Sequence, residues 1–396
     1  MGLTAIAILA VAVAPPSVEV VTLQGQTSKG AFHALTAKTL TLKDAAGKPT
    51  AVPVSEVMQA TFAKPAPPAT KARFTVTLVD GTVLPCTQVT ADSRASSATV
   101  ESPALGTLKL PLAAVSVLRF GAPNPKYEKK WKELLARDNR KDRLIIAKTE
   151  SLDFLPVVID RVTEKKIHFV LSGNPLDRNR DPANFFGIIF ARKKTPAKPF
   201  CNVRLAGGAS LQALRIAGDG SKLTVRLLSG ASIDVPPAYV AKLDFSLGKV
   251  RYLSDLEPRS VEFTPYFDDK FTRSLFRYRK DKAFAGKLTL GKTVFARGLW
   301  IHSRTLLKYR IAGEYRRFRA VMGIDHAVAK EGKGHVYVTF SGDGKTLFEG
   351  HVRGADAPRK LDLDVAGVRD LEILVDYGDN DGTADHLDLG DARVIK

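Results

Sequence analysis

The sequence is poor in the residues that build disulfide frameworks and zinc sites. Its 396 residues include only two cysteines, Cys86 and Cys201. Two cysteines are too few for a disulfide framework, and they lack the local Cys/His spacing of a zinc site. We expect both to be small buried hydrophobic residues, with a single long-range disulfide as the alternative. A disulfide-stapled small domain and a zinc finger are therefore excluded.

Long apolar runs and catalytic motifs are also missing. No apolar run reaches the roughly 18 residues that a membrane-spanning helix requires, so no transmembrane segment is predicted. The chain has no G-x-S-x-G, H-E-x-x-H or G-x-G-x-x-G motif, and each of these marks a known type of catalytic or cofactor site. The strand–helix alternation of a hydrolase barrel is missing as well. The sequence therefore predicts that the protein is not an enzyme, and it predicts no cofactor apart from the calcium considered below.

Positive charge is present in excess but is not concentrated. The chain has 60 Lys and Arg against 41 Asp and Glu, a net charge of +19. The excess is spread along the chain, with one modest peak between residues 121 and 200. A nucleic-acid groove needs clustered charge, so this pattern fits an anionic matrix or a basic secreted protein at least as well.

The first residues have the composition of an export signal. Residues 3–14 are an apolar stretch that ends in Ala-Val-Ala, a small-residue motif typical of signal-peptide cleavage sites. No Lys or Arg precedes the stretch, and a hydrophobic first strand is the alternative. We expect residues 1–14 to be a signal peptide and the protein to be secreted, periplasmic or attached to the cell surface.

A ten-residue pattern, P-x-x-x-V-x-x-x-x-F, occurs three times in the first 250 residues, and we call each copy an echo. The echoes begin at Pro53, Pro111 and Pro236, and a degenerate copy one residue shorter begins at Pro182. Alternating apolar and polar residues precede each echo, as in residues 74–78 and 223–227. We expect each valine and phenylalanine of the echoes to be buried, and residues 18–62 and 71–120 to share one fold.

The echoes divide this region into four small β units. Their expected bounds are residues 15–64, 71–121, 141–198 and 200–254, and their patterns resemble SH3-like or Sm-like barrels. We expect the units to form a scaffold without active chemistry. Nucleic-acid binding through Sm-like units is the alternative, favoured only by the net charge.

One short linking helix is expected between the second and third units, within residues 126–140. Tyr127, Trp131, Leu134 and Leu135 fall on one helical face. Acidic and basic residues alternate on the other face, so a solvated helix is favoured over a nucleic-acid or membrane-binding one.

The last 140 residues have a different character. The repeat disappears, and strand-like runs such as residues 306–311, 335–340 and 370–375 follow one another at spacings typical of an antiparallel sandwich. The runs G-L-W-I-H-S at 298–303 and Y-R-R-F-R-A-V-M-G-I-D at 315–325, and the ending D-H-L-D-L-G-D-A-R at 385–393, resemble the NPCBM family of carbohydrate-binding modules, which are found attached to glycoside hydrolases.

The resemblance covers residues from about 258 to 396. It implies that residues 255–396 form a galactose-binding-like β-sandwich that binds a glycan without catalysis. The fold class expected for the whole chain is therefore all-β, with the repeated barrel-like units followed by this sandwich. The partners it implies are a polysaccharide or glycan and other surface proteins, for an exported bacterial-type protein. Leu389 departs from the family, which usually has tryptophan there; this residue lies either in the core or at a sugar platform. If the sugar site is lost, the alternative is a structural or protein-interaction scaffold at the cell surface.

Sugar binding requires an aromatic face beside polar groups that can hold hydroxyls. Trp300 near Arg297 and Arg304, and Tyr377 beside an acidic loop, are the candidates, with His302 at a position that matches the family. Trp300 and His302 both lie in an apolar run, so each has a packing role in the core as its alternative.

The acidic loop itself is a candidate calcium site. Asp379, Asp381 and Asp385 surround Gly382, and calcium prefers several oxygen ligands around a sharp turn. The spacing is not that of an EF-hand, and a solvated hairpin tip is the alternative. We expect a structural calcium only if the three carboxylates converge.

Overall fold

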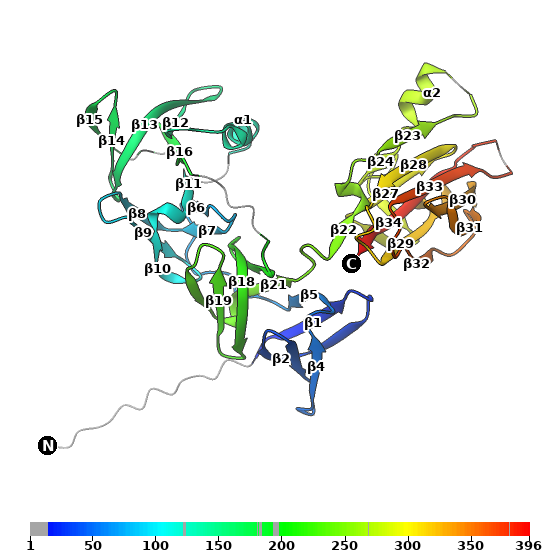
Figure 1. Cartoon of the computed structure of the whole chain (residues 1–396), viewed down its shortest axis with the longest axis horizontal. Helices are drawn as coiled ribbons and strands as arrows, with labels where there is room; N and C mark the ends of the chain where they lie inside the picture. Colours follow the sequence, from blue (N-terminus) through cyan, green and yellow to red (C-terminus); the bar gives the residue numbers. More distant parts are fainter. Residues whose placement is uncertain are drawn as a thin grey trace. The chain divides into compact units, whose positions relative to one another are not determined.

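The structure is a computed structural model that describes residues 15–121, 124–179, 181, 184–192, 198–267, 269–379 and 381–396. The expected signal peptide, the start of the degenerate echo and residues 193–197 lie outside these ranges. The chain divides into two compact units, Met1–Leu247 and Gly248–Lys396 (Figure 1). None of the helices in the described ranges combines the length and hydropathy that a membrane span requires.

The predicted all-β fold class is confirmed. The first unit consists of four five-stranded meanders. In each meander the first strand pairs with the second and the fifth, and the third strand lies between the second and the fourth. The second meander has its second strand divided into two, β7 and β8. The strands are β1 (Ser17–Thr22), β2 (Thr27–Leu35), β3 (Thr39–Lys43), β4 (Pro49–Pro53) and β5 (Val57–Phe62); β6 (Phe74–Leu78), β7 (Val83–Cys86), β8 (Gln88–Asp92), β9 (Ser97–Ser102), β10 (Gly106–Pro111) and β11 (Val115–Phe120); β12 (Asp142–Ala147), β13 (Leu152–Val162), β14 (Lys166–Leu171), β15 (Asn174–Asn179) and β16 (Phe185–Ile189); β17 (Cys201–Leu205), β18 (Ser210–Asp219), β19 (Leu223–Leu227), β20 (Ser232–Val235) and β21 (Val240–Asp244).

The echoes connect the fourth strand of a meander to the fifth. After the proline, the chain makes one tight turn, and the valine N–H donates to the carbonyl three residues before it: Val57 to Val54, Val115 to Leu112 and Val240 to Pro237. In two copies the turn is a short 3₁₀ helix, η1 (Leu112–Ala114) and η2 (Pro237–Tyr239). The valines and phenylalanines of all three echoes are buried, as expected. The repeated sequence is therefore a repeated corner of the core.

The fifth strands also join the meanders in pairs. β5 pairs antiparallel with β21, and Ala60 lies opposite Leu243, which holds the same place in its own echo. β11 pairs in the same way with β16, with Leu118 opposite Ile188. An antiparallel pair in which equivalent residues face each other has local two-fold symmetry. The first meander is thus paired with the fourth, and the second with the third.

The expected linking helix is α1 (Pro125–Ala136). The side chain of its N-cap residue, Asn124, accepts a hydrogen bond from the Lys126 N–H. The helix ends before residue 140, the last residue of the expected range. Trp131 and Leu134 are buried in a small core with Phe186, so the helix covers part of the third meander. Cys86 and Cys201 are buried thiols, as expected.

The second unit is a sandwich of two antiparallel sheets, with a short hairpin beside them. One sheet has the order β24-β27-β34-β29-β32, with β22 also on β34, and the other has the order β23-β28-β33-β30-β31. Their strands are β22 (Val250–Tyr252), β24 (Arg279–Lys280), β27 (Gly298–His302), β29 (Arg317–Ile324), β32 (Arg359–Asp364) and β34 (His386–Ile395); and β23 (Ser260–Phe263), β28 (Thr305–Arg310), β30 (His335–Gly342), β31 (Lys345–Arg353) and β33 (Asp370–Tyr377); the hairpin is β25 (Leu288–Leu290) and β26 (Thr293–Phe295). The remaining elements are η3 (Leu253–Asp255), α2 (Lys270–Leu275) and α3 (His326–Ala329).

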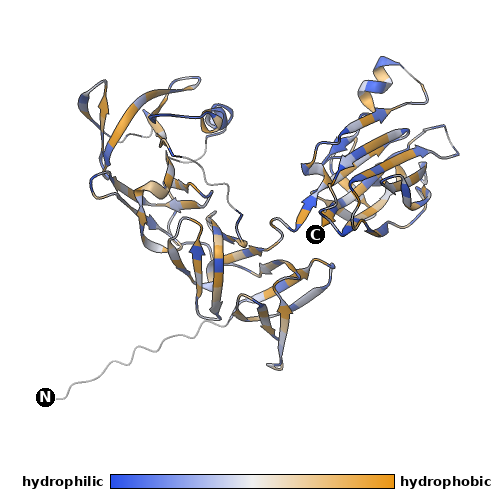
Figure 2. Cartoon of the chain, viewed as in Figure 1, coloured by the Kyte–Doolittle hydropathy of each residue, from blue (hydrophilic) through white to orange (hydrophobic). Residues whose placement is uncertain are grey.

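The core of the sandwich lies between the two sheets. Along many strands hydrophobic and hydrophilic residues alternate (Figure 2), and the inward side chains, such as Phe318 and Phe340, are fully buried. Leu389 is one of these core residues, so the position where the family usually has tryptophan packs in the interior here. Residues 248–254, expected to close the fourth β unit, belong to the second unit, because β22 pairs with β34.

Candidate functional site

Two connections lie side by side at one end of the sandwich. The first joins β27 to β28 through residues 303–304, and the second joins β33 to β34 through residues 378–385. His302 lies opposite His386, and Thr305 lies opposite Val375. The sheets therefore bring together the segments that contain the candidate residues Arg304 and Tyr377.

A buried polar network supports these connections. The Ser303 hydroxyl donates to Asp385 Oδ2 at 2.5 Å, and the His335 N–H donates to Asp385 Oδ1 at 3.2 Å. Asp385 and Ser303 are completely buried. Burial raises the pKa of Asp385 to about 6, although both hydrogen bonds favour its charged form. The network holds the two connections in one arrangement.

A second polar chain begins at the His335 ring. His335 Nδ1 accepts from the Asp379 N–H at 3.1 Å, and its Nε2 lies 2.9 Å from His351 Nδ1. Burial, followed by the charge of Arg353, lowers the pKa of His335. A neutral imidazole with its proton on Nε2 satisfies both contacts, so the ring fastens the 378–385 connection to β30 and β31.

The exposed surface beside this network is aromatic. Tyr266 and Phe267 are 54% and 71% exposed, and the Tyr266 ring lies 5.9 Å from that of Tyr377 in an edge-to-face arrangement. The Tyr377 hydroxyl donates to the Thr264 carbonyl at 2.5 Å, which fixes the ring. We call Tyr266, Phe267 and Tyr377 the aromatic rim.

An exposed ion pair lies next to Tyr377. Arg304 Nε is 3.1 Å from Asp376 Oδ2, and Asp376 directly precedes Tyr377 in the chain. The expected residues Arg304 and Tyr377 are thus brought together. Tyr266 and Phe267 were not predicted as site residues. The one feature of the sequence that could have indicated them is the run P-Y-F-D-D at 265–269, in which two aromatic residues lie between a proline and two aspartates.

Trp300 cannot act as a sugar platform. Its ring is fully buried with Ala283 and Leu288, and the Arg279 guanidinium covers it at 5.5 Å. Every residue of β27 is buried, and the strand pairs with β24 on one side and with β34 on the other. Trp300 is a core residue, which was its alternative interpretation.

His302 is likewise a packing residue. Its ring lies 4.2 Å from that of Phe276 and 5.6 Å from that of His386, and its Nδ1 is 2.7 Å from the Ser303 carbonyl. Burial lowers the pKa of His302 and takes that of His386 to about 4. Both rings are therefore neutral at pH 7.

The candidate Arg297 does not face the acidic loop. Its guanidinium binds Asp255 at 2.6 Å and Asp281 at 2.8 Å. Arg297 precedes the first residue of β27, whereas the 303–304 connection follows the last, and a five-residue strand is about 16 Å long. The strand therefore separates Arg297 from the site.

The three aspartates of the expected calcium site do not converge. Asp385 is buried against Ser303, Asp379 lies 3.2 Å from His335 Nδ1, and Asp381 is exposed. Across the part of the chain that the structure describes, no group of three His, Cys, Asp or Glu side chains could hold a metal ion. The loop is organised by hydrogen bonds of its protein groups.

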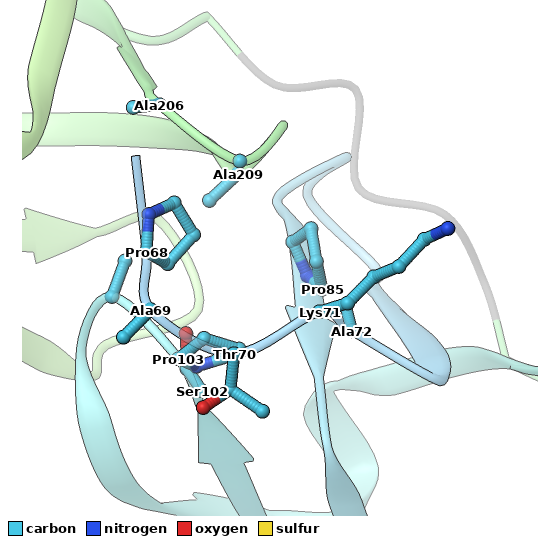
Figure 3. Close-up of a pocket in the computed structure, with 12 residues that line it drawn as sticks. Pro68, Ala69, Thr70, Lys71, Ala72, Pro85, Ser102, Pro103, Ala206 and Ala209 are labelled. Atoms are coloured by element: carbon cyan, nitrogen blue, oxygen red, sulfur yellow. The ribbon is translucent and has the colours of Figure 1, made fainter. Parts of the chain in front are cut away.

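The first unit also has a cavity, of about 390 Å³. Figure 3 shows Pro68, Thr70 and Pro85 around it, with Ala206 and Ala209 on another segment. Its walls are largely proline and alanine, and Lys71 is the one titratable residue among those that line it. Such walls offer packing surface but little chemistry.

A comparison with protein families finds a match in the second unit. Residues 249–395 match the model of the NPCBM/NEW2 domain, and no curated protein matches the chain. Among solved structures, the chain is similar to CBM51-2 and INT domains of Clostridium perfringens ZmpB in complex with GlcNAc, at 24% identity and a TM-score of 0.33, over 46% of this chain and 37% of that one.

Two further solved structures are similar. CBM51 of Clostridium perfringens GH95, in complex with methyl-galactose, has 22% identity and a TM-score of 0.32, over 37% of this chain and 99% of that one. The tandem CBM51 modules of Sp3GH98 from Streptococcus pneumoniae SP3-BS71 have 15% identity and a TM-score of 0.33, over 64% and 88%. The match spans little more than a third of the ZmpB chain named first. With the residues of the second unit matched from one end to the other, the C-terminal third of this chain is an NPCBM/NEW2 domain.

Proposed function

We propose that the second unit binds a glycan, without catalysing a reaction on it, at the aromatic rim. The observation that carries the proposal is the exposed Tyr266 beside Tyr377 and the ion pair of Arg304 and Asp376. A sugar ring has an apolar C–H face that packs on an aromatic ring, and hydroxyl groups that pair with charged side chains. The rim offers both kinds of contact within one surface, and the NPCBM/NEW2 family supports the same ligand class.

The buried network preorganises part of this surface, because it fixes a connection beside the rim before a ligand binds. Asp385 and His335 hold the connection that directly follows Tyr377, so little of this loop has to be ordered when a ligand binds. Binding costs less when the site is already arranged. For a single sugar-binding surface we expect a micromolar to millimolar dissociation constant, about −4 to −8 kcal/mol.

Titration of the full chain with a panel of neutral glycans, followed by calorimetry, tests the proposal. Tyr266→Ala removes one exposed ring of the aromatic rim and should weaken binding about tenfold, roughly 1.4 kcal/mol, which is within the range for an aromatic contact. Val294→Ala is the matched control, because Val294 is exposed and lies on the β25–β26 hairpin of the same unit. Equal affinities for the two variants would place the site elsewhere, and no glycan binding at all would reject the proposal.

For the first unit we propose a structural role. The meanders bind one another through their own fifth strands, which is the arrangement of a scaffold whose parts must keep a fixed spacing. A polysaccharide ligand would be met outside the cytoplasm, so we propose a secreted, periplasmic or surface location. Limited proteolysis of the full chain tests the scaffold: residues 15–247 should survive as one fragment.

A further inference from the structure

A second cavity is lined by residues that lie close in sequence to those of the aromatic rim. It has a volume of about 340 Å³ and is lined by Val261 and Phe263 of β23, Arg273 of α2, and Arg277 and Tyr278, which follow α2. We call it the α2 pocket. Its volume lies within the range of small-ligand sites, and three hydrophobic or aromatic residues form much of its wall.

The polar groups of the α2 pocket are donors. The residues that line it include two arginines and one tyrosine, and none of the described carboxylates is among them. Burial, followed by the charge of Glu257, raises the pKa of Tyr278, so its phenol keeps its proton. A neutral sugar needs acceptors as well as donors, whereas a pocket with two guanidinium groups matches an anion.

The two arginines differ in how they are held. Arg273 Nη1 donates to the Phe263 carbonyl at 3.0 Å, which ties α2 to β23 across the pocket. Within the described ranges, no hydrogen bond or ion pair engages the Arg277 guanidinium, although Arg297, Arg304 and Arg310 of the same unit are all paired with aspartates. Arg277 therefore has its full set of donors available for a ligand.

The pocket and the rim share one segment of chain. Phe263 lines the pocket, the Thr264 carbonyl accepts from Tyr377, and Tyr266 belongs to the rim. Three residues of extended chain span at most about 11 Å. An oligosaccharide that lies on the rim can thus place a neighbouring unit in the pocket.

We infer that the α2 pocket binds the anionic group of an acidic glycan, a carboxylate or a sulfate ester, whose adjoining sugar lies on the aromatic rim. The inference rests on the proposed glycan binding and adds the ligand class. The guanidinium plane matches the paired oxygens of a carboxylate or sulfate, and the opposite charges attract each other.

The test uses the full chain and three oligosaccharides of equal length: a neutral one, a hexuronate and a sulfated one, each titrated by calorimetry at constant ionic strength. The wild type should bind at least one acidic oligosaccharide about tenfold more tightly than the neutral one. Arg277→Gln removes one exposed charge. It should abolish that preference and leave the affinity for the neutral oligosaccharide unchanged. Whether the hexuronate or the sulfated ligand shows the preference identifies the anionic group.

Arg251→Gln is the matched control, because Arg251 is exposed on β22 and its replacement changes the net charge equally. If Arg251→Gln lowers acidic binding as much as Arg277→Gln does, overall charge explains the preference and the pocket assignment is wrong. If acidic and neutral ligands bind equally, the inference fails while glycan binding stands. If no oligosaccharide binds, the proposed function fails together with the inference.

Discussion

Both units bury polar side chains, but these groups serve different ends. In the first unit the buried Asp80 accepts from the N–H groups of Thr82 and Ser229, and the Thr82 hydroxyl accepts from the Gln212 N–H, so the groups join the second meander to the fourth. In the second unit Asp385 and His335 lie under two surface connections. Buried polar networks cost stability unless they are fully satisfied.

The difference in location indicates where function lies. Polar groups between repeats fix the spacing of a scaffold, whereas polar groups under exposed loops fix a surface that meets a ligand. Strongly shifted pKa values concentrate at functional sites, and the buried acids with raised pKa, Asp385 and Asp388, belong to the second unit. The following predictions test this division, beginning with the largest expected effect.

Phe120→Ala should destabilise the first unit alone. Phe120 is almost completely buried at the end of an echo, and removal of a buried phenylalanine ring costs about 3–5 kcal/mol. The two tryptophans report on the units separately, since Trp131 belongs to the first and Trp300 to the second. Urea unfolding of Trp300→Phe and Trp131→Phe backgrounds, followed by fluorescence, should show a shifted Trp131 transition and an unshifted Trp300 transition. A common shift would show that the units unfold as one.

Asp388→Asn should change the pH dependence of the second unit. Burial, followed by the charge of Asp325, raises the pKa of Asp388 far above its usual range. The folded state therefore holds a proton that the unfolded state has lost above about pH 4, so the free energy of unfolding falls as pH rises. Between pH 7 and 9, where histidines are neutral in both states, the wild type should lose up to about 1.4 kcal/mol per pH unit.

The asparagine variant should be nearly flat over the same range and at least as stable at pH 9. Its side-chain oxygen can still accept from the Thr289 N–H, as Asp388 Oδ2 does at 2.9 Å. Asp364→Asn, at an exposed position of β32, is the control and should keep the wild-type slope. The measurement is urea unfolding at several pH values with Trp300 as the reporter. An unchanged slope in Asp388→Asn would assign the buried proton to another group.

The comparison also shows what the sequence could reveal. The alternation of residues 223–227 predicted β19, and the echoes predicted the buried valines and phenylalanines, because one strand and one turn are specified locally. The pairing of β5 with β21 joins residues about 180 positions apart, and no local pattern specifies such a partner.

The candidate site shows the same contrast between features that the local sequence specifies and contacts between distant residues. Arg304 and Tyr377, chosen because sugar binding needs an aromatic ring beside a charged group, lie together because Arg304 precedes β28, Tyr377 ends β33, and these two strands pair. Arg297 has its partner Asp255 42 residues away, so its ion pair could not be read from the sequence. Trp300 was a candidate platform because of its residue type, and only its packing against Ala283, Leu288 and the Arg279 guanidinium shows that the ring is enclosed.

His335→Asn should remove part of the acid sensitivity of the second unit. The pKa of His335 is lowered in the folded state, so the unfolded state binds more protons below about pH 6.5 and stability falls as pH falls. His302 and His386 act in the same direction. Asparagine can still accept from the Asp379 N–H but has no ring to contact His351, at a cost of about 1 kcal/mol.

Unfolding between pH 7 and 5 measures this change. The variant should start slightly less stable at pH 7 and lose less stability than the wild type by pH 5. His326→Asn is the control, since His326 is exposed and begins the short helix α3. A variant as acid-sensitive as the wild type would place the titration in the other two histidines.

The smallest expected effect is that of salt on neutral glycan binding, and it separates the sandwich from a nucleic-acid role of the repeats. Packing on aromatic rings and hydrogen bonding to hydroxyls release no counterions, so the affinity should change less than about twofold between 50 and 500 mM NaCl. Contacts to phosphates would instead reduce the affinity by about 10³ to 10⁵ between 50 and 200 mM salt for 6–10 contacts. The 60 Lys and Arg residues are spread along the chain, and several in the second unit, such as Arg310 and Arg317, are paired with aspartates. We therefore expect only weak, non-specific association of the full chain with duplex DNA or single-stranded RNA in fluorescence anisotropy at 150 mM NaCl. Tight nucleic-acid binding with a steep salt slope would transfer the function from the sandwich to the meanders.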